Sequence, residues 1–97
     1  GDVIIGNKSI KEWHCDVGGD FFAKDSKLES VNPNCVFGGS VNISRTKNLK
    51  EWHCDVGGYF DALDSNLEKI VNCEIKGKIF CDNNVEIVTE EKHTMRM

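Results

Sequence analysis

The sequence contains a long internal repeat. Residues 10–31 return as residues 49–70, displaced by 39 positions, and 15 of the 22 aligned residues are identical. Weaker copies start at Asn34 and Asn72. Glycines therefore recur at spacings of 20, 19 and 19 residues, at Gly19, Gly39, Gly58 and Gly77. A fixed period of this length is typical of architectures in which each unit stacks on the next, so the chain predicts about four coils of 19–20 residues.

The residue pattern inside each coil is that of a β-strand. Apolar residues or glycine occupy every second position, which gives aligned columns such as Val17/Phe37/Val56/Ile75 and Phe21/Val41/Phe60/Ile79. Because successive side chains of a strand point to opposite faces, these columns face a core. We predict an all-β fold, a short β-solenoid or leucine-rich-repeat-like stack, forming one domain over residues 1–97. Residues 1–10 are expected to be a partial coil, 11–88 the coils, and 89–97 a cap or tail.

Two columns are expected to have structural roles. The glycines Gly19, Gly39, Gly58 and Gly77 predict a bend or a close backbone approach. Lys76 stands in the neighbouring column, so a side chain should be tolerated better at Gly57 than at Gly58. The cysteines Cys15, Cys35, Cys54 and Cys73 face inward in this register, which predicts buried, reduced thiols. Reduced thiols, and a sequence that shows no signal peptide as given, favour the cytoplasm.

The remaining side of each coil is expected to begin with a polar turn. A small polar residue recurs there, at Ser26, Thr46, Ser65 and Asn84. Such groups can bond the backbone of the next coil. Two or three positions later a large apolar residue is expected to close the coil, at Leu28, Leu49, Leu67 and Ile87. In the same alignment Trp13 and Trp52 share a column with Pro33 and Val71, and they either pack in the core or serve as exposed binding anchors.

Charge and hydropathy exclude two classes of partner. The formal net charge is −4, the isoelectric point is about 5.3, and Lys and Arg form no run. Non-specific nucleic-acid binding needs a basic footprint, so no nucleic-acid partner is expected. No apolar stretch approaches the roughly 18 residues of a membrane span, so no membrane partner is expected either.

The segment CDVGGYFDALDSNLEKI (residues 54–70) resembles the repeat of a group of bacterial and bacteriophage proteins. Their repeat reads Val-Gly-Gly, a hydrophobic–polar–hydrophobic strand, a Ser/Thr turn, then Leu or Ile. These proteins are treated as leucine-rich-repeat-like solenoids, and the resemblance covers residues 3–88. The chain departs from them in having Cys where Leu is common and Lys76 in place of a glycine. The resemblance implies a binding module and names no ligand.

The most suggestive group of chemical side chains is His14-Cys15-Asp16 with its copy His53-Cys54-Asp55, since all three types bind zinc. Adjacent strand residues point to opposite faces, so His and Cys of one triplet cannot share a metal. The two copies are two coils apart, roughly 9.5 Å, which is too far for one tetrahedral site. A cysteine nucleophile would need a nearby base, and its column neighbours are thiols and apolar groups. We therefore expect no catalytic residue, metal or cofactor, and no enzyme activity.

The leading hypothesis is a non-enzymatic module that binds a protein partner. The outward positions Tyr59, Asp61, Phe22 and Phe80 are the candidate contacts. The acidic residues Asp16, Asp20 and Asp55 are either a solvated face or a platform for a basic partner. The second reading would suit an inhibitor encoded by a phage or bacterium.

The alternative hypothesis is a structural subunit, or a fragment of a longer solenoid, that associates through its end coils. An open end of a stack exposes unpaired strand edges. The N-terminal edge carries Val3, Ile4 and Ile5. A homodimer through an end coil is the assembly expected in that case.

Overall fold

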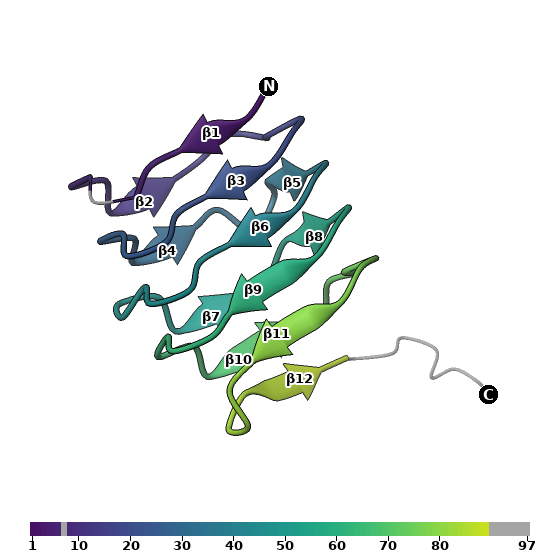
Figure 1. The fold of residues 1–97 in the computed structure, drawn as a ribbon. Helices are drawn as coiled ribbons and strands as arrows, with labels where there is room; N and C mark the ends of the chain where they lie inside the picture. The colour runs from purple at the N-terminus through teal and green to yellow at the C-terminus, as the bar shows by residue number, and fades with distance from the viewer. Residues whose placement is uncertain (7, 90–97) are drawn as a thin grey trace.

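The computed structural model describes residues 1–6 and 8–89, and in this part of the chain every regular element is a β-strand. All strand pairs are parallel, and the chain winds into stacked coils (Figure 1). The predicted all-β solenoid is confirmed. Of the expected tail 89–97, residues 90–97 lie outside the described residues.

Each coil passes through three faces. Face 1 is a five-stranded sheet, in the order β1 (Val3–Ile4), β3 (Phe21–Phe22), β6 (Val41–Asn42), β9 (Phe60–Ala62) and β11 (Ile79–Cys81). The register aligns Phe21, Val41, Phe60 and Ile79, as the period-two alignment predicted. Residues 1–10 contribute β1 as a fifth strand of the sheet.

Face 2 holds β2 (Glu12–Trp13) and β4 (Ser30–Val31), followed by β7 (Glu51–Trp52), β10 (Lys69–Val71) and β12 (Glu86–Val88). Face 3 holds β5 (Val36–Phe37) and β8 (Asp55–Val56), and single bridges join Val17 to Phe37 and Val56 to Ile75. The apolar column of face 3 is therefore also the one predicted.

The predicted register of face 2 is wrong. Trp13 aligns with Val31 and Trp52 aligns with Ile70, rather than with Pro33 and Val71. Val31 follows Trp13 by 18 residues, and Ile70 follows Trp52 by 18 residues. Because Trp13 and Trp52 are 39 residues apart, 21 residues separate Val31 from Trp52. The additional length lies in the connections on either side of face 2, and β4 and β7 belong to separate sheets. The lengths of the loops therefore determine which residues pair on face 2, because strands of two or three residues are too short to fix the register by themselves.

A row of aromatic rings runs through the centre of the stack. The ring centroids of Trp13, Phe21, Phe37, Trp52 and Phe60 follow one another at 5.1, 5.1, 5.2 and 4.9 Å in tilted or edge-on contacts. The indole Nε1 groups donate to the carbonyl oxygens of Cys15 and Cys54 in their own coils. Of the two readings of the tryptophans, core packing is therefore the correct one.

The glycines Gly19, Gly39, Gly58 and Gly77 lie at the corner between face 3 and face 1, and no glycine among the described residues has a positive φ. Close backbone approach explains them instead, because a Cβ on Gly77 would lie 2.7 Å from the carbonyl carbon of Gly58. The reason for expecting Gly57 to tolerate a side chain better than Gly58 is wrong, because neither position has room. A Cβ on Gly57 would overlap the carbonyl oxygen of Gly38. A Cβ on Gly58 would overlap the Oγ of Ser40 and would lie 3.0 Å from the Ser40 nitrogen and 3.1 Å from the Gly39 carbonyl carbon.

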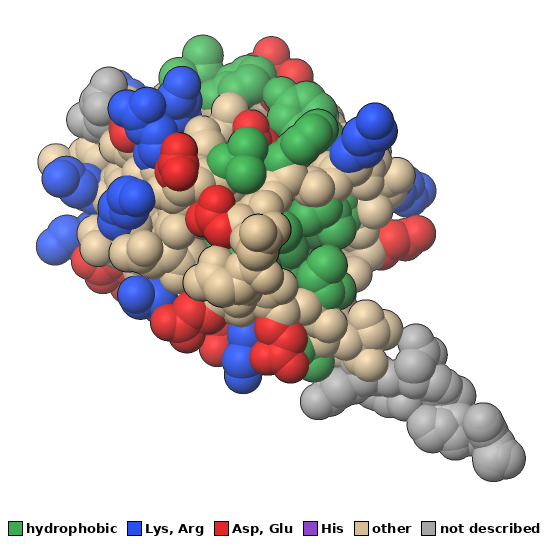
Figure 2. Space-filling view, turned by 60° about the horizontal axis from the view of Figure 1, so that its bottom comes forward, with side chains coloured by type: hydrophobic (Ala, Val, Ile, Leu, Met, Phe, Trp, Pro, Cys, Tyr) green, Lys and Arg blue, Asp and Glu red, His purple; other side chains and the backbone are tan. Residues whose placement is uncertain are grey.

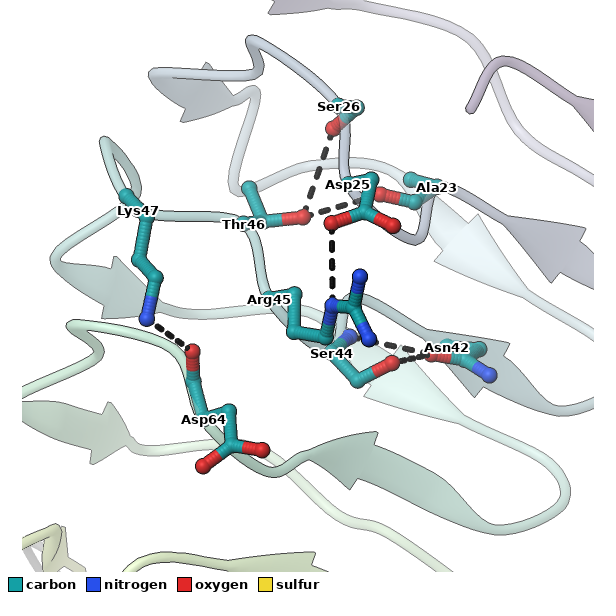
Figure 3. A network of polar contacts seen from close by, with 9 residues as sticks. All are labelled: Ala23, Asp25, Ser26, Asn42, Ser44, Arg45, Thr46, Lys47 and Asp64. Carbon is teal, nitrogen blue, oxygen red and sulfur yellow. Dashed lines mark hydrogen bonds and ion pairs between the residues drawn. The ribbon is translucent and has the colours of Figure 1, made fainter. Parts of the chain in front are cut away.

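The turns between face 1 and face 2 are shown in Figure 3. Asp25, Arg45 and Asp64 have φ of 59°, 59° and 56°, the left-handed region that few residues other than glycine adopt. The Thr46 hydroxyl lies 3.4 Å from that of Ser26 and donates to the carbonyl oxygen of Ala23 at 2.8 Å. The predicted polar link between coils exists at this level.

The same link is absent at Ser65, whose hydroxyl donates to the carbonyl oxygen of Ala62 in its own coil. The closing apolar residues Leu28, Leu49 and Leu67 are buried as predicted. Ile87 is 57% exposed, and Val85 packs against the core in its place. The last turn is shorter, so the prediction for Ile87 is wrong.

Candidate functional site

The His-Cys-Asp triplet sends its three side chains to different surroundings. The Nε2 of His14 lies 3.2 Å from Oε1 of Glu12, and the Nε2 of His53 lies 2.9 Å from Oε1 of Glu51. Residues two apart on a strand share a face, which explains both pairs. In residues 1–6 and 8–89 no group of three or more His, Cys, Asp or Glu side chains is placed to hold a metal ion.

The aspartates of the candidate acidic surface bond neighbouring coils together. A carboxylate oxygen of Asp16 accepts the backbone N–H of Val36 at 2.8 Å, and Asp55 accepts that of Glu74 at 2.8 Å. Asp20 does the same for Ser40. Hydrogen bonds to an ionised group are stronger than neutral ones. The sequence analysis missed this structural role, and partner binding by the three aspartates stays a prediction.

The cysteine column is buried only in part. Cys35 and Cys54 are buried, Cys73 is half-buried, and Cys15 is exposed. The prediction is wrong for Cys15 because β2 is the first strand of face 2, so no coil covers Cys15 on the N-terminal side of the stack. Burial raises the pKa of the Cys54 thiol to about 12 and that of Cys73 to about 11. Both are therefore protonated at neutral pH, which makes them poor nucleophiles.

The outer surface of face 1 brings most of the candidate binding residues together. Along β9, Phe60 and Ala62 are buried, so Tyr59, Asp61 and Leu63 point outward. Phe80 of β11 stands in register with Asp61. The rings of Tyr59 and Phe80 meet edge to face at 6.2 Å.

Phe22 lies in the same column but is separated from Asp61 by Asn42. The sequence analysis missed Leu63. Leu63 could have been predicted to point outward, because it follows Asp61 by two residues and alternate residues of a strand share a face.

Tyr59, Leu63 and Phe80 form what we call the apolar patch. Their exposed fractions are 39%, 42% and 41%. Face 1 lies at the upper side of the view in Figure 2, where hydrophobic side chains cluster. Large apolar side chains exposed together on a β-surface are typical of interaction sites.

Face 3 carries a shallow groove of about 310 Å³. Val36, exposed to 52%, lies in it, and Asp55, Glu74 and Lys76 line it. Asp55 is already bonded to the backbone of Glu74. The groove lining includes neither a thiol nor an imidazole, so it lacks a nucleophile and base in reach of each other.

Basic residues gather at the edge formed by the turns between face 1 and face 2, which lies at the left in Figure 2. These turns carry Lys24, Lys27, Arg45 and Lys47. Arg45 pairs with the Asp25 carboxylate at 3.1 Å and Lys47 donates to the carbonyl oxygen of Asp64. Acidic and basic groups are therefore mixed along this edge.

Comparison of the chain with protein-family models, with curated proteins and with solved structures gave no significant match. Within the described part of the chain there is no helix long and apolar enough to cross a membrane. The candidate functional site is therefore inferred from the arrangement of side chains on face 1.

Proposed function

We propose that the protein is a non-enzymatic repeat module that binds a protein partner through the outer surface of face 1, with the apolar patch at its centre. The observation that carries this proposal is the exposure of Tyr59 and Leu63 on either side of β9 and of Phe80 on β11, with the rings of Tyr59 and Phe80 in contact. Aromatic side chains dominate the free energy of binding at many protein interfaces.

The framework beneath the patch favours binding of a preformed surface. The neighbouring inward residues Phe60 and Ala62 are fully buried, so the strand is anchored on the core. A rigid β-surface loses little conformational entropy when a partner docks. Asp61 lies between the apolar side chains and supplies a hydrogen-bond acceptor, although it also accepts the N–H of Leu63.

The chemistry of the remaining side chains supports binding over catalysis. Burial raises the pKa values of the Cys54 and Cys73 thiols, and the two histidines of the described residues, His14 and His53, pair with Glu12 and Glu51. We also propose a cytoplasmic location, which the five free cysteines support because thiols stay reduced in that compartment. An inhibitor encoded by a phage or bacterium would act in this way.

The test is capture of partners by immobilised protein from a lysate of the source organism. We compare the wild type with the double variant Tyr59→Ser/Phe80→Ser and with the control Val36→Ser, which alters an exposed apolar residue of face 3. Proteins captured by the wild type and by Val36→Ser should be lost from the double variant, because hot-spot side chains contribute about 2 kcal/mol or more each. Equal capture by all three folded proteins would refute binding through face 1.

A structural subunit is the second candidate, and one observation favours it. The core residues Ile75, Ile79 and Cys81 of the last coil are only partly buried, whereas their counterparts in the three coils before it are buried. An end with exposed apolar groups promotes stacking of further strands. Mass that keeps growing with protein concentration would favour this candidate.

A further inference from the structure

Over the four strands β3, β6, β9 and β11, two outward columns of face 1 carry charges that reverse in sign from the first of these strands to the last. One outward column runs from Asp20 of the β3 coil to Lys78 of the β11 coil. The column on the other side runs from Lys24 to Asp82 in the same two coils. Within these four strands Asp20 and Lys78 therefore match in opposite sign, as do Lys24 and Asp82. Asp2 of the β1 coil lies outside the matched part, and Asp61 would lie opposite Asn42.

This reversal is what a two-fold axis requires. An axis parallel to the strands and placed between β6 and β9 would lay the β3 coil of one copy on the β11 coil of another. Rotation about this axis leaves each residue at the same height along the strand direction. Asp20 of one copy would therefore face Lys78 of the other, and Lys24 would face Asp82. Each pair would occur twice, because a two-fold interface is made of the same surface from both copies.

Side-chain size follows the same symmetry. The axis would also lay the β6 coil on the β9 coil, so Tyr59 would lie over the small Ser40, and Leu63 would lie over the position of Ser44, which is itself buried. Phe22 would meet Phe80, which matches an aromatic ring to an aromatic ring. Large side chains would thus fill the space above small ones rather than collide. Two sheets packed face to face keep their strands nearly aligned about 10 Å apart, which suits this axis.

The charged groups are available for such contacts. Among the described residues no side-chain partner contacts the ammonium groups of Lys24 and Lys78. Asp20 and Asp82 each use one carboxylate oxygen, for the backbone N–H groups of Ser40 and Asp64. Their second oxygens are left to accept from an ammonium group.

We propose that the partner of face 1 is a second copy of this chain, in a closed dimer with its two-fold axis parallel to the strands between β6 and β9. This inference rests on the proposed function, since it uses the same surface. Four strands about 4.8 Å apart give a footprint of roughly 15–20 Å on each side. The buried area falls below the roughly 1,200–2,000 Å² of stable complexes, so the dimer is weak.

The test is sedimentation equilibrium from micromolar to millimolar protein. The wild type should rise from the monomer mass toward the dimer mass and no further. Lys24→Asp places like charges opposite each other twice, which should raise the dissociation constant about tenfold. Adding Asp82→Lys to this variant should restore the affinity. The control Lys27→Asp, a reversal in the adjoining turn, should leave it unchanged.

Lys78→Glu provides a second variant that disturbs no side-chain contact among the described residues. It should weaken the dimer as Lys24→Asp does, even if Asp82→Lys impairs folding. A monomer at every concentration, a mass that passes the dimer, or a folded Lys24→Asp/Asp82→Lys variant as weak as Lys24→Asp would overturn the dimer. If the wild type stays monomeric while capture still depends on Tyr59 and Phe80, only the dimer fails. If capture is also independent of them, the proposed function fails as well.

Discussion

The two copies of the 22-residue repeat have nearly the same sequence but different surroundings. Trp52 and Cys54 in the second copy are buried, whereas their counterparts Trp13 and Cys15 are half-buried and exposed. The second copy has coils on both sides, whereas β2 of the first copy is the first strand of face 2 and has no coil before it on that face. In a solenoid the burial of a residue therefore depends on its place in the stack as much as on its type.

The largest difference in stability between equivalent substitutions in the two copies should appear at the tryptophans. Trp52→Ala should lower the free energy of unfolding by about 3–5 kcal/mol, because it removes a buried ring in contact with Phe37 and Phe60. Trp13→Ala should cost less, since that indole contacts Phe21 and is partly exposed. Urea denaturation of both variants measures the difference. Equal losses would mean that both copies are enclosed alike.

The second difference in stability should appear at the first glycine of the Gly-Gly pair in each copy, Gly18 and Gly57. Gly57→Val should destabilise the protein by about 1–3 kcal/mol or more, because its Cβ would overlap the backbone of Gly38. Gly18→Val should be much milder, since the nearest atom to its Cβ is the Gly1 nitrogen at 3.8 Å. Thermal unfolding by circular dichroism compares the two. A larger loss at Gly18 would contradict the stacking order.

The carboxylate bonds between coils should be equivalent in the two copies. Asp16→Ala and Asp55→Ala each leave a backbone N–H of the next coil without its acceptor, at Val36 and Glu74. We expect each to cost about 1–2 kcal/mol, measured by urea denaturation. The control Glu68→Ala removes an exposed carboxylate to which no described hydrogen bond is made, at a residue without a positive φ, and it should cost less. Unequal effects at Asp16 and Asp55 would show that position in the stack also governs these surface bonds.

The mildest test uses the thiols without changing the fold. At neutral pH Cys15 should react quickly with a thiol reagent, whereas Cys54 should react only when the stack opens. Mass spectrometry after digestion assigns the label to each cysteine. Comparable rates would mean that the face 2 strands open freely.

The raised pKa of Cys54 also predicts a loss of stability in alkali. The thiol ordinarily titrates near 9.0, and burial raises its pKa to about 12 in the folded protein. The protonated thiol thus favours folding fully below pH 9, and this contribution disappears as the pH rises toward 12. Cys54→Ala should flatten the dependence of unfolding free energy on pH in that range. An unchanged slope would place the thiol in contact with water.

The candidate site was only partly predictable. Tyr59, Asp61 and Phe80 could be named from the outward alternation, but their proximity depends on the pairing of β9 with β11. The roles of Asp16, Asp20 and Asp55 could not be inferred, because a carboxylate finds the N–H of the next coil only once the coils are stacked. Leu63 was not predicted because the other residues of its repeat column, Lys24, Ser44 and Asp82, are polar.

The sequence by itself determined the architecture. A period of 19–20 residues with alternating apolar positions leaves stacked parallel strands as the arrangement that buries every apolar column, and faces 1 and 3 follow that alignment. The tertiary structure alone decided the register of face 2, the exposure of Cys15 and the charge pattern across face 1. Each of these depends on which residue of one coil meets which residue of the next. Loop lengths and chain position set that match, and a local pattern cannot encode it.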